Sequence, residues 1–311
     1  MTRAPLFMGI DGGGSKLRIA IANSELETRS SQTFGGANPN IIGQEAARAK
    51  VQRGISKLMQ RAGLQREDIT AVAIGIAGAS NLHSEPWLVE TVKPVLPASF
   101  LLPSSDLEIA LAGALAQRRG ILLLAGTGSA AYGRAPSGER LQIGGWGYLL
   151  GDEGSSYWIG IQLLKHIVNE YDSGAGPRLT NLSKACLNAL GLSQARDLVA
   201  WVYRSERAPV ERVAGLAPYV LQGADAGEAQ ALRILRCAAD HLVSQVETLR
   251  RRLSYERAPI AFAGGLLDNA NALSEEVARR LALPERPTAK YPPVTGAALL
   301  AKLEWSAKNR S

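Results

Sequence analysis

The sequence has few of the residues that build disulfide frameworks and metal clusters. Its 311 residues include two cysteines, Cys186 and Cys237, and no CxxC pair. This usage rules out a disulfide framework, fits a reducing cytosol and argues against structural zinc or an iron–sulfur cluster. No apolar run approaches the roughly 18 residues of a membrane-spanning helix, and the stretch before the first glycine turn is too short for a signal peptide. We therefore expect a cytoplasmic protein that does not contact a membrane.

A strongly basic cluster is also missing, although the net charge is +7. The basic residues are dispersed, and the densest group, at 250–252, ends a predicted helix, where the helix dipole favours cations. We expect no nucleic-acid partner and attribute the positive balance to attraction of small anionic ligands.

Glycine, in contrast, is abundant: the chain has 32 glycines, 46% hydrophobic and 20% charged residues. This composition is that of a globular protein with a glycine excess over the usual ~7%. No Gly-X-Y period occurs, which excludes collagen. At ~150 residues per domain, the length predicts two domains.

An apolar strand, a glycine turn and a second strand occur twice in the chain. Residues 6–10 and 17–22 flank the first turn, and residues 120–125 and 130–134 flank the second. The recurrence predicts two similar halves with a boundary near 118–120.

The first turn has the composition of a phosphate-binding loop. Its three glycines allow close backbone approach and positive φ, and their N–H groups can form an anion nest. A tight hairpin is the alternative, but three glycines exceed what a two-residue hairpin needs. Asp11, at the strand end, suits Mg²⁺, directly or through water. The residues expected at the phosphate are Gly12, Gly13, Gly14, Ser15 and Lys16.

The second turn, Gly126, Thr127 and Gly128, is expected to bind the other end of a triphosphate. Residues 126–131 match the dinucleotide fingerprint G-x-G-x-x-A, but that fingerprint must open a helix. A turn at 136–138 follows too soon, so we predict a strand and reject NAD. No P-loop motif occurs.

Asp106 follows a predicted strand and begins a predicted helix. An aspartate there often caps the helix. No histidine lies in any glycine motif, however, so a carboxylate is the available base for an attacking hydroxyl.

The segment 144–160 is the most specific in the chain. Trp146 among three glycines is a poor core arrangement, and an exposed ring beside Asp152 and Glu153 suits a sugar. The alternative is that these acidic residues complement the dipole of the following helix.

Two further turns have a structural and a functional interpretation. Asn38 lies in a Gly/Asn/Pro stretch typical of turns. Gly264 and Gly265 follow a strand, where they either allow helix packing or let a nucleoside lie against the backbone.

Together these motifs resemble those of the sugar kinase, Hsp70 and actin superfamily. Residues 11–16 and 126–129 resemble its two phosphate motifs, and 262–269 its adenosine motif. Within it the chain resembles the BadF/BadG/BcrA/BcrD ATPase family, and the order GTGS, GGWG, GDEGSSYW is similar to its N-acetylglucosamine kinases. The resemblance implies an α/β fold of two RNase H-like (actin-like ATPase) domains with a nucleotide and sugar cleft between them. The expected domains are 1–118 with the closing helix, about 294–311, and 119–293 with helical additions.

The implied activity is ATP-dependent phosphorylation of an amino sugar, N-acetylglucosamine, at its 6-hydroxyl, with Mg²⁺. A glucosamine kinase is the alternative; an ATPase activator of a radical dehydratase would need cluster cysteines. A homodimer is a common outcome.

Asp106 would be the base, although the family usually has a small residue where Leu107 stands. The implied sugar contacts are Asn38, Asp106, Ser129, Gly145, Trp146 and Asp152; Ser15, Lys16 and Thr127 would contact phosphates, and Gly264 and Gly265 the adenosine.

Overall fold

The computed structural model describes residues 4–79, 84–174, 179–203 and 209–309. The chain divides into two compact units, 1–122 with 289–311, and 123–288. Each contains a β-sheet and helices, with strand orders β3-β2-β1-β4-β5 and β8-β7-β6-β9. The expected fold class, two actin-like α/β domains, is confirmed.

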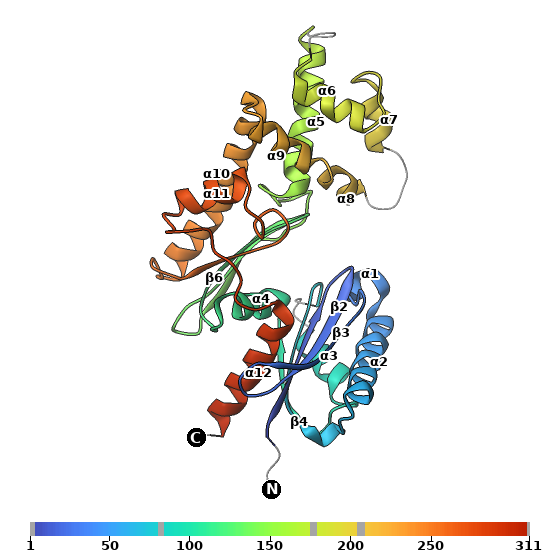
Figure 1. Ribbon diagram of the computed structural model, residues 1–311, viewed down its shortest axis with the longest axis vertical. Coiled ribbons are helices and arrows are strands. Elements are labelled where there is room, and N and C mark those ends of the chain that lie inside the picture. The colour runs from blue at the N-terminus through green and yellow to red at the C-terminus, as the bar shows by residue number, and fades with distance from the viewer. Residues whose placement is uncertain (1–3, 80–83, 175–178, 204–208, 310–311) are drawn as a thin grey trace. The chain divides into compact units, whose positions relative to one another are not determined.

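The sheet of the first unit combines a hairpin with parallel strands (Figure 1). β1 pairs antiparallel with β2 and parallel with β4, which in turn pairs parallel with β5. The first glycine turn thus joins two strands, as predicted. The five strands are β1 (Leu6–Gly12), β2 (Lys16–Ala22), β3 (Thr28–Gly35), β4 (Ile69–Ile76) and β5 (Phe100–Ser104).

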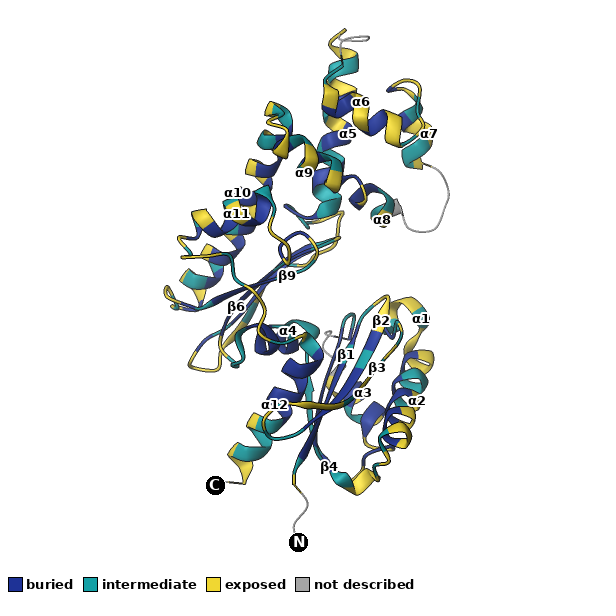
Figure 2. Ribbon diagram, in the orientation of Figure 1, coloured by how far each residue is buried: buried dark blue, intermediate teal, exposed yellow. Residues whose placement is uncertain are grey.

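Alternation along β1 explains why helices cover both faces of this sheet. Met8 and Ile10 point to one core cluster and Phe7 to another, because successive side chains point to opposite faces. The first cluster includes residues of α2 and α3, and the second residues of α4 and α12, which appear as buried stripes in Figure 2. The helices of the unit are α1 (Pro39–Ile42), α2 (Gln44–Ala62), α3 (Ser84–Val92), α4 (Asp106–Leu115) and α12 (Pro293–Lys308).

The closing helix α12 begins at Pro293, next to the start at about 294 expected from the sequence. Proline is tolerated in the first helical turn, because its missing N–H would have no intrahelical partner there. Gly296 lets α12 approach α4: a Cβ there would lie 2.1 Å from the carbonyl oxygen of Ile109.

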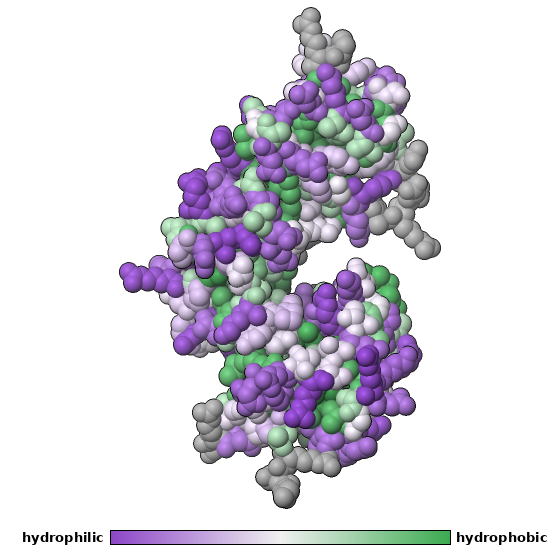
Figure 3. All heavy atoms as spheres, in the orientation of Figure 1, coloured by the Kyte–Doolittle hydropathy of each residue, from purple (hydrophilic) through white to green (hydrophobic). Residues whose placement is uncertain are grey.

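The second unit has a smaller sheet and more helix. β7 pairs antiparallel with β8, and the division between the units falls inside β6. Hydrophilic residues gather on the visible surface of α10 and α11 (Figure 3). The strands of the second unit are β6 (Gly120–Ala125), β7 (Ser129–Arg134), β8 (Arg140–Gly144) and β9 (Ile260–Ala263). Its helices are α5 (Ser156–Asp172), α6 (Asn181–Ala189), α7 (Asp197–Tyr203), α8 (Pro209–Ala214), α9 (Ala217–Asp225), α10 (Ala229–Arg252) and α11 (Ala272–Arg280).

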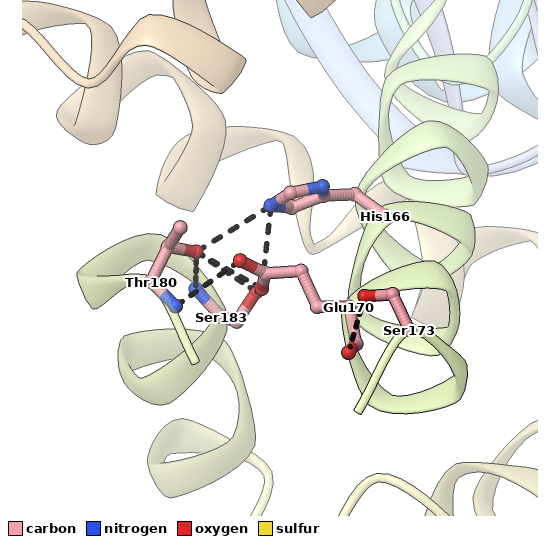
Figure 4. A network of polar contacts seen from close by, with 5 residues as sticks. All are labelled: His166, Glu170, Ser173, Thr180 and Ser183. Carbon is pink, nitrogen blue, oxygen red and sulfur yellow. Dashed lines mark hydrogen bonds and ion pairs between the residues drawn. The ribbon is translucent and has the colours of Figure 1, made fainter. Parts of the chain in front are cut away.

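A polar network attaches α6 to α5 (Figure 4). The Glu170 carboxylate accepts hydrogen bonds from the Thr180 backbone N–H, at 3.2 Å, and from the Ser183 hydroxyl, and it lies 3.4 Å from Nε2 of His166. Thr180 also caps α6, because its side chain accepts from the backbone N–H of Ser183. These residues bond to one another across the two helices, so we assign the network to helix packing.

Among the described residues, no helix combines the length and the apolar character needed to cross a bilayer.

Candidate functional site

The ends of three parallel strands bring the two candidate acidic residues of the first unit, Asp11 and Asp106, to one edge of the sheet. Asp11 on β1 pairs in register with Gly75 on β4, and Gly75 with Ser104 on β5. Gly75 brings no side chain between the two outer strands, and a Cβ there would lie 2.7 Å from the carbonyl oxygen of Ser105. Asp11 and the turn that carries Asp106 therefore share the carboxyl-terminal edge of this sheet.

Asp106 is not the cap of α4. The N-cap is Ser105, whose hydroxyl accepts from the backbone N–H of Glu108 at 3.0 Å, and Asp106 is the first helical residue. The capping interpretation of Asp106 is therefore wrong. Burial raises the pKa of Asp106, hydrogen bonds from the backbone N–H groups of residues 106 and 107 oppose this rise, and the charge of Asp11 adds to it. A carboxylate with a raised pKa is a stronger base, as proton abstraction requires.

Asp11 is a mostly buried carboxylate with one cationic neighbour. Its Oδ2 lies 3.4 Å from Nη1 of Arg18, its register partner on β2. Burial raises the pKa of Asp11, and the guanidinium of Arg18 acts in the opposite direction. No group of three or more His, Cys, Asp or Glu residues that could hold a metal occurs in the described ranges. A single carboxylate oxygen still fits Mg²⁺, which binds through one or two carboxylates together with waters and substrate phosphates.

The glycines of the first turn do not have the backbone conformation expected of them, and the tightest approach is made by Gly36 outside the turn. None of Gly12, Gly13 and Gly14 has φ in the left-handed region, so the expectation of positive φ is wrong. A Cβ at Gly36 would instead lie 1.8 Å from the carbonyl oxygen of Gly14. Two turn carbonyls bind neighbouring loops: Gly12 accepts from the N–H of Ala77 and Gly13 from that of Ala37. Exposed residues remain for a ligand at Gly14, Ser15 and Lys16.

Asn38 lies next to this turn and is held by its neighbours. It caps the short helix α1, and its Oδ1 accepts from the N–H of Asn40 at 2.8 Å. Gly78, at φ +81, leaves room for its amide, because a Cβ there would lie 2.3 Å from Oδ1 of Asn38. The structural interpretation of Asn38 as a turn residue is therefore correct, and its place beside the glycine turn also fits a ligand contact.

In the second unit, the turn 126–128 joins two strands. β7 begins at Ser129, so the dinucleotide fingerprint does not open a helix and the rejection of NAD is consistent with the fold. The carbonyls of Gly126 and Thr127 accept from the N–H groups of Ser156 and Tyr157 at the start of α5. Those contacts anchor the turn and leave Thr127 itself exposed.

Asp152 packs against the same turn. Its backbone adopts φ +62, and its Oδ1 accepts from the N–H of Ser129 at 3.2 Å. A Cβ at Gly128 would lie 2.7 Å from Oδ2 of Asp152. Burial raises the pKa of Asp152, and the Ser129 hydrogen bond opposes this rise. Ser129 is only 2% exposed, and its hydroxyl donates to the carbonyl of Glu153 at 2.8 Å, so its hydrogen-bonding groups face the protein.

The loop that carries Trp146 is built for exposure. Gly144, Gly145 and Gly147 have φ of +76, +74 and +83, values that favour glycine. The Trp146 side chain is 74% exposed and Leu149 80% exposed. The indole is thus outside the core, as the surrounding glycines indicated, and available to a ligand.

The predicted adenosine turn lies beside the second phosphate turn. Gly264 has φ +90, and a Cβ there would lie 2.4 Å from the carbonyl oxygen of Ala125. A Cβ at Gly126 would lie 3.8 Å from the backbone nitrogen of Gly265. A Cβ at Gly265 would have no atom within 4 Å. Burial raises the pKa of Asp268, while the N–H of Gly264 hydrogen-bonds its carboxylate.

Sequence reasoning missed several contacts that shape these turns. Gly36, Gly75 and Gly78 were expected at candidate loops or strand ends, but the sequence did not show which neighbouring backbone or side chain each of them leaves room for. Gln245 was missed as well, although a glutamine within the apolar spacing of α10 is a local exception to that pattern.

Comparison with known proteins identifies the class and then the family. The model of the BadF/BadG/BcrA/BcrD ATPase family matches residues 8–301. An N-acetylmuramic acid/N-acetylglucosamine kinase of Clostridium acetobutylicum is 32% identical over 89% of this chain and 90% of the relative. An N-acetyl-D-glucosamine kinase of Dictyostelium discoideum is 28% identical over 95% and 97%. A solved structure from Chromobacterium violaceum is 24% identical, covers 96% of this chain and 99% of its own, and superposes with a TM-score of 0.70.

The fold and the glycine turns define an actin-like ATP-dependent phosphotransferase. The chain belongs to the BadF/BadG/BcrA/BcrD ATPase family, as its motifs predicted.

Proposed function

We propose that this protein transfers the γ-phosphoryl group of ATP to the 6-hydroxyl of an amino sugar, with N-acetylglucosamine as the preferred acceptor. The observation that carries the proposal is the position of Asp106. Ser105, and not Asp106, is the N-cap of α4. Burial raises the pKa of the Asp106 carboxyl group. Asp106 also shares a sheet edge with Asp11 and the first glycine turn.

In this proposal Asp106 accepts the proton of the sugar 6-hydroxyl as the oxygen attacks the γ-phosphorus. Phosphoryl transfer depends mainly on positioning and on electrostatic stabilisation, and an aspartate that orients the hydroxyl is a recurring component. The proton moves from the hydroxyl oxygen to Asp106, the new O–P bond forms, and ADP leaves with the β–γ bridging oxygen.

The exposed turn residues would hold the nucleotide. In this proposal Ser15 and Lys16 contact phosphates, and the backbone of Gly12, Gly13 and Gly14 lies close to them. The N–H of Gly13 already donates to the carbonyl of Lys16. Gly126, Thr127 and Gly128 contact phosphates in the second unit. Gly264 and Gly265 lie against the adenosine. Asp11 would hold Mg²⁺, directly or through water, and the ion when bound neutralises charge on the phosphates.

The remaining residues would bind the sugar. The exposed ring of Trp146 offers an apolar face, while Asn38 and Asp152 offer an amide and a carboxylate to hydroxyl or acetamido groups. Gly145 lets the loop backbone approach the ring. Ser129 was expected to contact the sugar. Its side chain is buried, and its hydroxyl already donates to the carbonyl of Glu153, so a direct contact is disfavoured. We infer that Ser129 serves the sugar by holding Asp152.

A coupled ADP-release assay tests the acceptor. The panel contains glucose, glucosamine, N-acetylglucosamine, N-acetylmannosamine and N-acetylmuramic acid, the last because of the name of the Clostridium relative. The expected result is the highest kcat/KM with N-acetylglucosamine and a phosphorus–proton coupling at carbon 6 of the product. Preference for glucosamine would support the alternative acceptor, and turnover of none of these sugars would overturn the proposal.

A further inference from the structure

Helix α10 buries one polar side chain on an otherwise apolar face. Gln245 is 9% exposed, and its neighbours on that face are Leu242, Val246 and Leu249, each 0% exposed. Burying an amide is unfavourable unless its groups find hydrogen-bond partners. A partner or a function at this position should therefore explain the glutamine.

The partner is Ser129. Nε2 of Gln245 lies 3.4 Å from the hydroxyl oxygen of Ser129. Ser129 is the junction of the proposed sugar loops: its N–H donates to Asp152, its hydroxyl to the carbonyl of Glu153, and its carbonyl accepts from the N–H of Gly145 at 3.0 Å.

The donor inventory fixes the direction of the Gln245 contact. A serine hydroxyl has one proton, and that of Ser129 goes to the Glu153 carbonyl. The amide of Gln245 must therefore donate, which leaves its Oε1 buried without a hydrogen-bond partner among the described residues. An unsatisfied buried acceptor is unfavourable for folding and calls for an explanation.

The same amide also limits the loop that carries Trp146. A Cβ at Gly144 would lie 3.3 Å from the amide carbon and nitrogen of Gln245. Gln245 thus touches both the hydroxyl that holds the Glu153 carbonyl and the glycine that starts the exposed loop.

We propose that Gln245 is a positioning residue for the amino-sugar site: it fixes the side chain of Ser129, whose hydroxyl, N–H and carbonyl hold Glu153, Asp152 and Gly145. This inference rests on the proposed function. It predicts that removing the amide weakens sugar binding without weakening the fold, because the variant loses an unsatisfied oxygen together with the Ser129 contact.

Two substitutions separate the donor role from simple space filling. Gln245→Met keeps the length of the side chain and removes the hydrogen bond. Gln245→Glu replaces the donor by an acceptor, so the Ser129 proton is drawn away from Glu153. The matched control is Gln32→Met on β3 of the first unit, where an amide oxygen is likewise buried without a partner among the described residues.

The assay measures KM for N-acetylglucosamine, KM for ATP, kcat and the thermal midpoint of each full-length variant. For Gln245→Met we expect the sugar KM to rise roughly five- to tenfold, as loss of one buried hydrogen bond predicts. KM for ATP should be unchanged and the thermal midpoint equal or higher. Gln245→Glu should raise the sugar KM further, and Gln32→Met should leave both KM values at wild-type levels.

The outcomes distinguish this inference from the proposed function. If the wild type phosphorylates an amino sugar and Gln245→Met has the wild-type sugar KM, the positioning role is wrong and the function stands. An equal rise in both KM values together with a lower thermal midpoint would show a merely structural role. If the wild type neither phosphorylates nor binds any amino sugar, the proposed function fails and this inference fails with it.

Discussion

Asp11 and Asp106 lie at the ends of two strands of one sheet, and the negative charge of Asp11 contributes to the raised pKa of Asp106. Burial is the larger cause of that rise. Gly75, in register with Asp11 and Ser104, has no side chain that would meet the carbonyl group of Ser105. The arrangement places the carboxylate proposed to hold Mg²⁺ and the carboxylate proposed as the base at one edge of the sheet.

Replacing Asp106 with Asn should remove turnover and spare nucleotide binding. The amide cannot accept the hydroxyl proton, so we expect kcat to fall about 10²- to 10⁴-fold, the usual contribution of a general base. ATP affinity, measured by calorimetry, should stay within about twofold. Asp172→Asn, an exposed position at the end of α5, is the control and should have wild-type kcat. Turnover of Asp106→Asn near the wild-type rate would show that another group is the base.

The same substitution should stabilise the protein at neutral pH. Because burial raises the pKa of Asp106 in the folded state, its contribution to stability is present below the unfolded pKa of about 3.9 and lost as pH rises through the folded pKa. Asp106→Asn avoids this loss. Urea unfolding at several pH values should therefore give Asp106→Asn a higher midpoint at pH 7.5 and a shrinking advantage as pH falls. If the urea midpoints of Asp106→Asn and the wild type differ by the same amount at every pH, the pKa of Asp106 is not raised.

Gly36 and Gly13 should respond differently to alanine. A Cβ at Gly36 would lie 1.8 Å from the Gly14 carbonyl oxygen, whereas the nearest atom to a Cβ at Gly13 lies 3.8 Å away. Gly36→Ala should destabilise the fold by about 1–3 kcal/mol, as an overpacked site does. Gly13→Ala should keep the wild-type unfolding midpoint but weaken ATP binding, because backbone close to a phosphate leaves no room for a methyl group.

Thermal unfolding and ATP titration of both glycine variants check this prediction. If Gly36→Ala and Gly13→Ala lower the thermal midpoint equally, the close approach of Gly36 to the Gly14 carbonyl does not decide the stability of the turn. Unchanged ATP affinity in Gly13→Ala would remove Gly13 from the proposed phosphate contacts.

Trp146→Ala should lower sugar affinity and leave stability unchanged. The side chain is 74% exposed, so its removal creates no core cavity. We expect the KM for N-acetylglucosamine to rise about tenfold, equivalent to ~1.4 kcal/mol. Trp87, which is 7% exposed, provides the contrast: Trp87→Ala should cost about 3–5 kcal/mol of folding free energy. A wild-type sugar KM for Trp146→Ala would exclude the indole from the sugar site.

Apolar patterning was sufficient to locate the strands that bury apolar residues but not the polar ones. β6 has the bounds expected from its apolar run, and so has β9, an edge strand whose first three residues are buried. β3 was not predicted, because its residues are mostly polar and none of them is buried. β8 was missed for the same reason: it is a short strand without a buried residue. A strand that buries little surface has little hydrophobic signature.

The sequence by itself determined the family, the two glycine turns and the exposure of Trp146, because glycines and apolar runs act locally on the backbone. Only the tertiary structure decided which groups are free to react. It assigned the cap of α4 to Ser105 instead of Asp106, and it buried Ser129 between Asp152, Glu153 and Gln245. It also showed that position 36 needs glycine, because its backbone packs on the carbonyl group of Gly14. These contacts join residues far apart in the chain, and no local pattern records which distant group competes for a proton, a hydrogen bond or a space.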